Sequence, residues 1–444
     1  MLAVLGQSWA LLLGMLLLML GNGLQGTLLG VRGSLENIDA ATMGYIMSAY
    51  FVGFLLGSRL TPSMLQRVGH VRVFAALGSL VSAAFILYAA AVDPLSWTAL
   101  RLLVGFCFSG IYVVAESWLN HSSTNETRGQ ALSLYMIVQM SGMVLGQLLL
   151  NVADPAGYGL FVLITVLVSI SFAPMLLSSS PAPRHQSARA MSLPTLVRTS
   201  PLASVGMLLL GGVFSALFAM SSVYATERGL SIRDTSYFIT AIFLGGLFFQ
   251  YPIGWLSDRL DRRLLIIGTT GTGALATVFA VLFGESLWVL FGTALVLGGM
   301  ANPLYSLLVA YANDYLELED MAGAAGGLLF INGFGAMSGP IIVGTMMSRY
   351  GIEWFFISVG ILMSVICLYG LYRMTQRPYI VGDERAPYLA ITSRTGIVAT
   401  SMGLEAAVEG DADASAESET APDAGGVALP PGLASVAKAG AEGS

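Results

Sequence analysis

The sequence predicts an all-α, polytopic membrane protein with twelve transmembrane helices in two pseudo-symmetric six-helix bundles. Three observations support this prediction: an apolar composition, a series of long apolar stretches and an internal repeat. Of the 444 residues, 55% are hydrophobic and 10% are charged, whereas a soluble domain carries roughly 25% charged residues. A soluble chain of this length needs a charged surface, which this sequence cannot supply.

The net charge is located after the apolar part of the chain. Residues 1–374 contain 16 acidic and 16 basic side chains, whereas residues 375–444 contain ten acids and four bases. The net charge of −6 therefore belongs to the tail and says nothing about a ligand. We expect no nucleic-acid partner.

Cysteine and histidine are rare. Cys107 and Cys367 lie in separate apolar runs, which offers neither a disulfide framework nor metal-ligand spacing. His70, His121 and His185 fall in polar connectors, where we expect them to be solvated. We therefore predict no metal site and no cofactor. Because the expected spans hold no cluster of His, Cys or carboxylate groups, we also predict no enzymatic activity.

Twelve apolar stretches are long enough to cross a bilayer, which requires about 20 residues with internally satisfied backbone hydrogen bonds. Residues 1–30 lack a basic segment and a small-residue cleavage site, so we interpret the first stretch as a retained span. The expected spans lie near residues 8–30, 43–60, 72–92, 95–118, 130–151, 158–178, 203–225, 235–256, 264–283, 287–311, 323–347 and 354–373.

The longest polar connector separates the sixth span from the seventh and holds Pro181, Pro183 and Pro194. We therefore expect an N-terminal six-helix bundle, a cytoplasmic linker, a C-terminal bundle and a cytoplasmic tail. From about residue 403 the chain is rich in Ala, Gly and acids, a composition that cannot offset chain entropy by burial, so disorder is expected there. These four segments cover residues 1–178, 179–202, 203–374 and 375–444.

The arginines predict the orientation, because cations are retained on the cytoplasmic side of a membrane. With the N-terminus inside, twelve arginines of the connectors fall on the cytoplasmic side and four fall outside. Both termini are therefore expected in the cytoplasm. The outer set is Arg32, Arg228, Arg233 and Arg349, and the cytoplasmic set is Arg59, Arg67, Arg72, Arg128, Arg184, Arg189, Arg198, Arg259, Arg262, Arg263, Arg373 and Arg377.

An internal repeat relates the two halves. A shift of 193 residues places Gly105 on Gly298 and carries the same register through spans four and five onto spans ten and eleven. Weak symmetry between halves is typical of transporters. The further matches are Tyr112 with Tyr305, Asn120 with Asn313, Gln139 with Asn332, Gly142 with Gly335 and Gly146 with Gly339.

The strongest local motif lies between the eighth and ninth spans. Gly254, Asp258, Arg259, Arg262 and Arg263 follow a pattern that resembles the loop signature G-x-x-x-D-R-x-G-R-R of the major facilitator superfamily, with an aspartate at the second glycine. A glycine lets helices approach closely, and an aspartate at a helix end can accept hydrogen bonds from the N-terminal amides of another helix. We expect these five residues to form a cytoplasmic gate. The alternative is a basic anchor to the membrane.

The equivalent connector of the first half, residues 57–72, keeps glycines and arginines but has no aspartate. By pseudo-symmetry it should face the start of span eleven, which is preceded by acids. We infer that the charge has moved across the gate to this partner, although acids at a helix start also stabilise the helix dipole. The acids are Asp314, Glu317, Glu319 and Asp320.

Span four contains two charged residues. Arg101, followed by Gly105, is similar to the second signature of the same family. An isolated guanidinium in a span costs at least about 2.5 kcal/mol, so we expect Arg101 to face a cavity; the alternative is that it extends to the outer surface. Glu116 is a proton-coupling candidate, because removal from water favours the neutral form of a carboxyl group. Its alternative is an interfacial acid bonded to a loop arginine. The two residues lie about 22 Å apart along the helix and cannot pair.

As a whole, residues 8–373 resemble the major facilitator superfamily, and span four together with residues 250–254 resembles a poorly characterised bacterial subgroup. The resemblance implies two bundles that rock about a central site in a bacterial inner membrane. It also implies a small-molecule solute and the lipid bilayer as partners. Polar groups expected along the substrate pathway, each of which could instead bond across a helix interface, are Asn22, Gln25, Arg101, Tyr112, Ser221, Asn302 and Tyr305.

The sequence therefore predicts a secondary active transporter for a small neutral or anionic organic solute, working by alternating access with protons as the candidate driving ion. Two alternatives stay open. One is a multidrug-type efflux carrier for lipophilic compounds, and the other is a non-transporting sensor that signals through its acidic tail. We expect a monomer.

Overall fold

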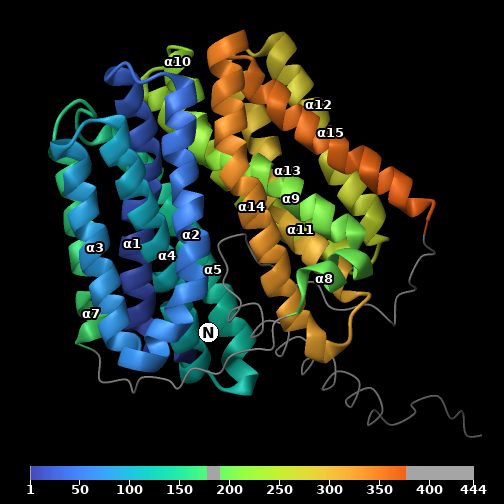
Figure 1. Cartoon of the computed structure of the whole chain (residues 1–444), viewed down its shortest axis with the longest axis horizontal. Helices are drawn as coiled ribbons and strands as arrows, with labels where there is room; N and C mark the ends of the chain where they lie inside the picture. Colours follow the sequence, from blue (N-terminus) through green and yellow to red (C-terminus); the bar gives the residue numbers. More distant parts are fainter. Residues whose placement is uncertain (1, 178–190, 377–444) are drawn as a thin grey trace, which may run out of the picture. The chain divides into compact units, whose positions relative to one another are not determined.

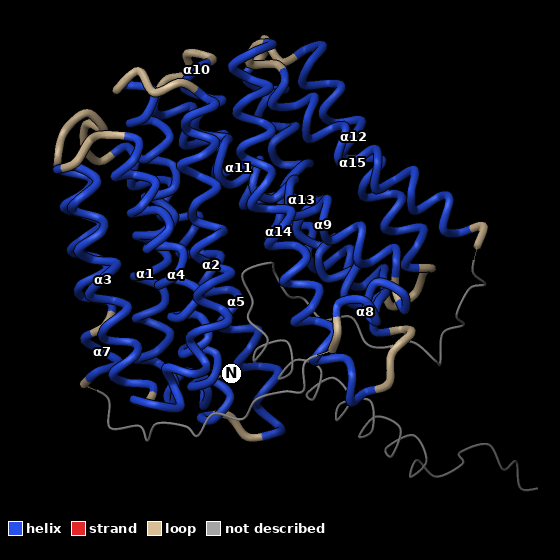
Figure 2. The backbone as a smooth tube through the Cα atoms, in the orientation of Figure 1, coloured by secondary structure: helices blue, strands red, loops and turns tan. Residues whose placement is uncertain are grey.

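The computed structural model describes residues 2–177 and 191–376, which form helices joined by short connectors (Figures 1 and 2). Twelve helical spans in these described ranges are long and apolar enough to cross a membrane. The first half contains α1 (Leu2–Leu35), α2 (Ala40–Val68), α3 (His70–Ala90), α4 (Pro94–Ser122), α5 (Asn125–Leu148), η1 (Leu149–Asn151), α6 (Gly159–Ser171) and α7 (Ala173–Leu176). The second half contains α8 (Leu193–Thr199), α9 (Pro201–Ser215), η2 (Ala216–Met220), α10 (Ser221–Glu227), α11 (Ile232–Ser257), α12 (Arg262–Phe283), α13 (Leu287–Asn313), α14 (Leu318–Tyr350) and α15 (Trp354–Met374).

Each of the twelve expected spans falls on one of the twelve spans of the structure. The sixth is completed by α6 and α7 together, and the seventh by α9, η2 and α10. The expected start of the C-terminal bundle at residue 203 is late, since α9 begins at Pro201. The expected linker, residues 179–202, also contains the short helix α8. Its first part, and the tail beyond residue 376 with its predicted disorder, lie outside the described residues.

Short polar residues and glycines set the helix ends. Asp39 begins α2 by accepting hydrogen bonds from the backbone amides of Ala41 and Thr42, which satisfies amides that have no partner within the helix. Ser231 caps α11 in the same way. Gly69 ends α2 with φ = 82°, in the left-handed region where a side chain is strained.

The two halves repeat the same packing. In the first half α1 packs on α5 and α6, α2 and α3 pack on α4, and α3 also contacts α6. In the second half α9 packs on α14 and α15, α11 and α12 pack on α13, and α12 also contacts α15. A Cβ atom on Gly105 would collide with the carbonyl oxygen of Tyr50, and one on Gly298 would collide with that of Ile242. The 193-residue repeat therefore corresponds to equivalent close helix crossings.

Consecutive spans run antiparallel, so connectors alternate between two ends of the bundles. We call one the linker end, which carries residues 69, 123–124, 258–261 and 314–317, and the other the far end, which carries residues 36–39, 91–93, 152–158, 228–231, 284–286 and 351–353.

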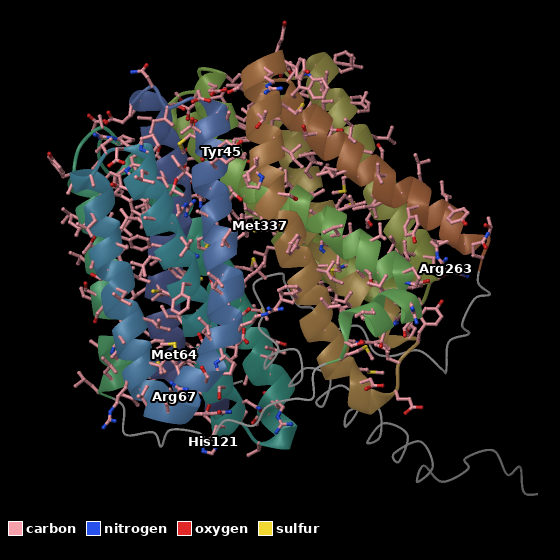
Figure 3. The ribbon with its side chains drawn as sticks, viewed as in Figure 1. Tyr45, Met64, Arg67, His121, Arg263 and Met337 are labelled. Carbon is pink, nitrogen blue, oxygen red and sulfur yellow. The ribbon has the colours of Figure 1, made fainter. Side chains whose placement is uncertain are left out.

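Within the described residues the halves contact each other mainly through three helix pairs: α2 with α14, α1 with α10, and α5 with α11. The Ser348 hydroxyl accepts a hydrogen bond from the Ala41 amide at 3.1 Å and donates one to Asp39 at 3.3 Å. Further along the same pair, Ser48 of α2 donates to the backbone carbonyl of Met337 on α14. Figure 3 labels Met337 on α14.

Candidate functional site

A cavity lies between the two halves, and we call it the central cavity. Its volume of about 90 Å³ is several times the space that one water molecule needs. Apolar and aromatic side chains supply most of the lining, with a few polar groups among them, as is usual for small-molecule sites. The lining residues are Asn22, Gly23, Gly26, Thr27, Met47, Tyr50, Phe51, Phe54, Arg101, Met143, Gln147, Phe214, Phe218, Ala219, Ile239, Phe243, Leu329, Asn332, Gly333 and Ala336.

Arg101 lines the central cavity, as the sequence predicted, and its side chain is buried. Its Nη1 atom donates a 2.8 Å hydrogen bond to Oε1 of Gln25, and its Nη2 atom lies 2.7 Å from the sulfur of Met47. The guanidinium also lies over the Tyr50 ring, 5.5 Å from the centroid. Residues of α1 and α2 therefore hold the guanidinium of this α4 residue in place.

Asn22 and Tyr112 form a second polar contact in the first half. Asn22 lines the cavity and donates a long 3.4 Å hydrogen bond to the Tyr112 hydroxyl, which lies behind it. Four of the seven expected pathway residues, namely Asn22, Gln25, Arg101 and Tyr112, thus lie at the cavity wall or bond to a residue that does.

The other three expected pathway residues are not among those that line the cavity. Ser221 donates to the carbonyl of Leu217 in its own helix at 2.5 Å. Asn302 donates to the carbonyl of Gly298 at 3.1 Å and fills the space beside Gly246. Tyr305 is buried, with its ring 6.4 Å from that of Phe214.

Sequence reasoning did not select the polar residues Thr27, Gln147 and Asn332, which all line the cavity. Thr27 donates a 2.5 Å hydrogen bond to Oε1 of Gln147, whose Nε2 donates to the carbonyl of Gly23 at 2.9 Å. Asn332 donates to the carbonyl of Met207 at 3.0 Å. The 193-residue repeat, which pairs Asn332 with Gln139, was the one signal that pointed to Asn332.

Glu116 is fully buried near the linker end of α4. Its carboxyl group lies within electrostatic range of the hydroxyl groups of Tyr135 and Tyr305, which belong to different halves. The neighbouring Ser117 hydroxyl lies 2.9 Å from Nε2 of His70. The expectation of a solvated His70 is therefore wrong: its side chain is 2% exposed. The reason is that α3 begins at this residue and packs its first turn against α4.

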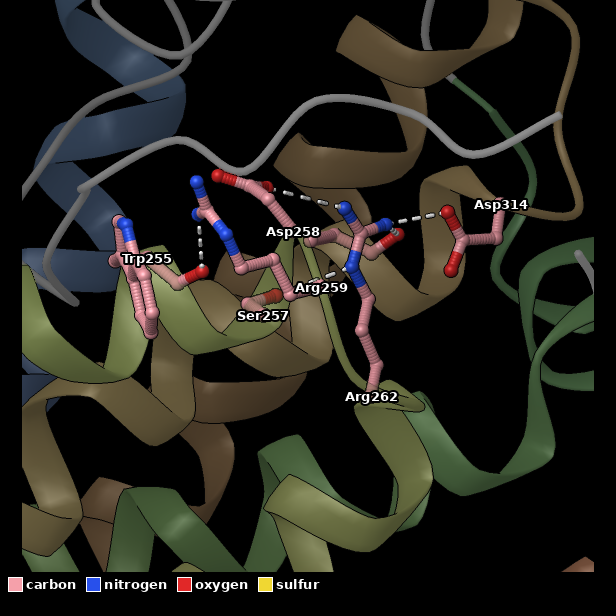
Figure 4. Close-up of polar contacts among 7 residues, drawn as sticks. Trp255, Ser257, Asp258, Arg259, Arg262 and Asp314 are labelled. Carbon is pink, nitrogen blue, oxygen red and sulfur yellow. Dashed lines mark hydrogen bonds and ion pairs between the residues drawn. The ribbon is translucent and has the colours of Figure 1, made fainter. Parts of the chain in front are cut away.

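The gate motif forms a charged network at the linker end of the second half (Figure 4). Arg262 is 3% exposed and pairs with Asp314, while its Nε atom donates to Ser257 at 3.2 Å. Asp258 lies 3.9 Å from the same guanidinium. Arg259 covers the Trp255 ring, 4.0 Å from the centroid. Gly254 is buried in the last turns of α11, and Arg263 pairs with Asp261 at 2.7 Å.

The ion pair of Asp314 with Arg262 stays within the second half, although the sequence interpretation placed that acid opposite the connector of the first half. The pseudo-symmetric partners do meet in another way. Arg59 of α2 lies over the Phe330 ring of α14, 4.3 Å from the centroid. A cation–π contact therefore joins the two halves there.

No group of three or more His, Cys, Asp or Glu side chains could hold a metal ion within the described ranges. The polar groups of the central cavity can bind a solute through hydrogen bonds and one positive charge. The linker-end network can hold helix ends together.

Comparisons with known proteins show which proteins the chain is similar to. The family model described as "Major Facilitator Superfamily" matches this chain over residues 11–243 and 203–404. An uncharacterized MFS-type transporter of Yersinia pestis (strain Pestoides F) is 27% identical over 388 residues, covering 86% of this chain and 97% of the relative. The MFS-type transporter YcaD of Escherichia fergusonii is also 27% identical, over 79% of this chain and 91% of the relative.

Two solved structures share the fold. The crystal structure of the nucleoside transporter NupG has a TM-score of 0.67 at 13% identity, covering 83% of this chain and 98% of that one. The human organic anion transporter MFSD10 has a TM-score of 0.57 at 16% identity, covering 81% and 98%. Together with the twelve spans and the matched family description, these likenesses identify the chain as a membrane transporter of the Major Facilitator Superfamily, a multi-pass protein of the bacterial inner membrane.

Proposed function

We propose that this protein is a secondary active transporter that moves a small organic solute across the inner membrane by alternating access. The observation that carries the proposal is the central cavity, which is lined by residues of both halves. A site that two bundles share can open to either side when they rock against each other. Because one chain supplies both walls, we propose that it works as a monomer.

The proposal includes an orientation. The arginine count places the linker end in the cytoplasm, so the far-end contacts of Asp39, Ala41 and Ser348 would close the outer side. The described conformation would then be inward-facing, with the network around Arg262 and Asp258 as part of a cytoplasmic gate.

Single cysteines can test the orientation after Cys107 and Cys367 are replaced. Val152 and His121 are exposed in the far-end and linker-end regions, respectively. In intact cells an impermeant maleimide should label Val152→Cys and leave His121→Cys unlabelled until the membrane is permeabilised. The reverse pattern would overturn the orientation.

Transport itself can be tested by locking the far end. Ala41→Cys with Ser348→Cys should cross-link, because the Ala41 amide and the Ser348 hydroxyl are 3.1 Å apart. Small molecules inside and outside cells would be compared by mass spectrometry for the wild type, the reduced and the oxidised double variant, and cells without the protein. We expect at least one organic solute to redistribute with the wild type and the reduced variant, and not with the oxidised one. No redistribution, or redistribution unaffected by the cross-link, would refute alternating-access transport.

The mostly apolar wall of the cavity, with its aromatic rings, also fits an efflux carrier of lipophilic compounds, which is the second candidate function. It predicts that cells producing the wild type survive higher concentrations of several unrelated lipophilic inhibitors than cells producing the oxidised, locked variant. Equal survival would remove this candidate and leave a carrier for one class of solute.

A further inference from the structure

Arg101 carries a positive charge into the central cavity, and the described residues that line the cavity supply no carboxylate to match it. Its side chain is 5% exposed. Among the described residues the Nε atom has no hydrogen-bond partner. One terminal nitrogen is bonded to a neutral amide and the other contacts a thioether, which is a weak acceptor.

Burying a cation without an opposite charge has an unfavourable free energy, because the loss of hydration is offset only by a close, well-aligned anion. The Tyr50 ring compensates in part through its π face. It supplies no acceptor for the guanidinium hydrogens. The site is therefore electrostatically incomplete without a ligand that brings a negative charge.

Gln25 holds the guanidinium in place and acts as a positioning residue. Its side chain is 1% exposed, and its amide oxygen accepts the 2.8 Å bond from Nη1. The Tyr88 hydroxyl lies next to Gln25, although not in hydrogen-bonding geometry. A guanidinium fixed in this way presents its fork with little further loss of side-chain entropy, which suits the planar, bidentate carboxylate group.

The rest of the cavity suits an apolar, flat body. Tyr50, Phe51 and Phe54 come from α2 of the first half, while Phe214 and Phe218 come from the second half. Aromatic rings favour offset or edge contacts with another ring and add to the stabilisation from apolar burial. Because the lining holds a single cation, it neutralises one negative charge and not two.

We propose that the central cavity binds an organic monoanion with an aromatic or similarly flat apolar body, whose carboxylate pairs with Arg101. This inference rests on the proposed function and narrows its substrate class. It separates carboxylates from neutral compounds of the same shape, which would leave the guanidinium uncompensated.

The test measures binding to the purified, detergent-solubilised full-length protein. Matched probes are benzoate with benzamide and indole-3-acetate with indole-3-acetamide, each up to about 10 mM, which is roughly tenfold above the usual upper range of Michaelis constants. A ligand that binds the folded state raises the unfolding temperature. We expect at least one acid to raise it in a saturable way, and its amide to bind at least about tenfold more weakly, in line with the loss of a charge-assisted hydrogen bond.

Two variants examine the role of the guanidinium. Arg101→Gln removes the charge. Gln25→Glu replaces the amide beside Arg101 with a carboxylate of nearly the same size, which should form an ion pair with the guanidinium in place of a ligand. Both should weaken binding of the acid by at least about tenfold and leave amide binding unchanged. Arg233→Gln, which removes an exposed cation at the far end, should bind like the wild type. Gln25→Glu keeps the test informative if Arg101→Gln does not fold.

The proposal is overturned if no acid shifts the unfolding temperature, if acid and amide act alike, or if Gln25→Glu binds the acid as the wild type does. These outcomes differ from failure of the transport proposal. Redistribution of a solute that depends on the far-end lock, without carboxylate binding, would refute only the substrate class. Carboxylate binding that depends on Arg101, without any flux, would refute only transport.

Discussion

Arg262 is the most buried cation of the gate motif, and its pair with Asp314 joins the start of α12 to the end of α13. Removing one partner of a buried ion pair leaves the other charge uncompensated and costs about 3 kcal/mol. We therefore predict that Arg262→Gln lowers the unfolding free energy by about that amount. Arg259→Gln, which removes an exposed cation of the same motif, should change it by less than about 1 kcal/mol.

The control for this prediction is the double variant Arg262→Gln with Asp314→Asn, measured by thermal unfolding. Because the double variant leaves neither buried member of this pair without its opposite charge, its loss should be smaller than the sum of the two single losses. Additive losses would mean that the two side chains stabilise the linker end independently. The network would then lack the energetic coupling between its residues that a gate requires.

Asp39 makes the far-end contact dependent on pH, but only in acid. Its pKa lies below the ordinary value of 3.8, mainly because the Thr42 hydroxyl donates a hydrogen bond to the carboxylate. A lowered folded-state pKa adds stability that is fully present above pH 3.8 and is lost as the pH falls through the lower folded value. Asp39→Asn keeps a side chain that can cap the helix but removes the negative charge at its start. That charge contributes about 0.3–1 kcal/mol to the unfolding free energy.

We predict that the wild type unfolds at a higher temperature than Asp39→Asn near neutral pH. The gap should close as the pH falls below 3.8. Thermal unfolding of both proteins over a series of buffers measures the gap directly. A gap that persists in strong acid would show that the difference comes from packing and not from ionisation.

The residue scale also shows where sequence reasoning succeeds. Arg101 could be selected because a charge inside an apolar run needs a cavity or a partner. Ser221 and Asn302 could not be separated from cavity residues, because their hydroxyl and amide groups can bond to their own helices and a sequence does not give the rotation of a helix. His70 was misjudged because hydropathy locates the apolar segment and not the helix, which starts at that polar residue.

At the scale of elements, close crossings with α4 and α13 depend on equivalent glycines. A methyl group on Gly105 would collide with the Tyr50 carbonyl and one on Gly298 with the Ile242 carbonyl. We predict that Gly105→Ala and Gly298→Ala each lower the unfolding free energy by about 1–3 kcal/mol, because backbone must move to accept the extra atom. Thermal unfolding of purified variants provides the measurement.

The matched control lies on the same helix as Gly298. Gly292 of α13 is exposed, and a methyl group at this position would meet no neighbouring atom within 4 Å. Gly292→Ala should therefore leave stability unchanged or raise it by up to about 1 kcal/mol, the difference in helix propensity. If all three variants behave alike, the crossings tolerate separation and the repeat has no packing role.

The elements themselves were predictable from the sequence. A span needs about 20 apolar residues, and an isolated apolar segment in lipid must form a helix because only a helix satisfies its backbone hydrogen bonds internally. The ends of the helices were harder to predict. The first span extends to Leu35 and the second to Val68, beyond the apolar stretches. Water and headgroups accept polar helix turns, so hydropathy does not mark those ends.

At the scale of the whole molecule, coupling requires a group whose protonation changes with the conformation. Glu116 is fully buried on α4 and lies within electrostatic range of Tyr305 in the other half, so its charge can favour one arrangement of the halves over another. His70 is the nearby competitor, because its imidazole is a second ionisable group and its ring contacts Ser117, the neighbour of Glu116. The two residues make different predictions for one experiment.

The experiment measures the distance between spin labels at His121→Cys and Leu260→Cys, two exposed linker-end sites in different halves, with Cys107 and Cys367 replaced. Between about pH 5.5 and about pH 8.5 we predict two distance populations whose ratio changes with pH. Glu116→Gln should hold the ratio constant, since its side chain cannot ionise, whereas His70→Gln should keep the change. A ratio that still responds to pH in Glu116→Gln would exclude Glu116 as the coupling group. If His70→Gln alone abolished the response, the buried histidine would take that role, because it would then be the group whose ionisation distinguishes the two arrangements of the halves.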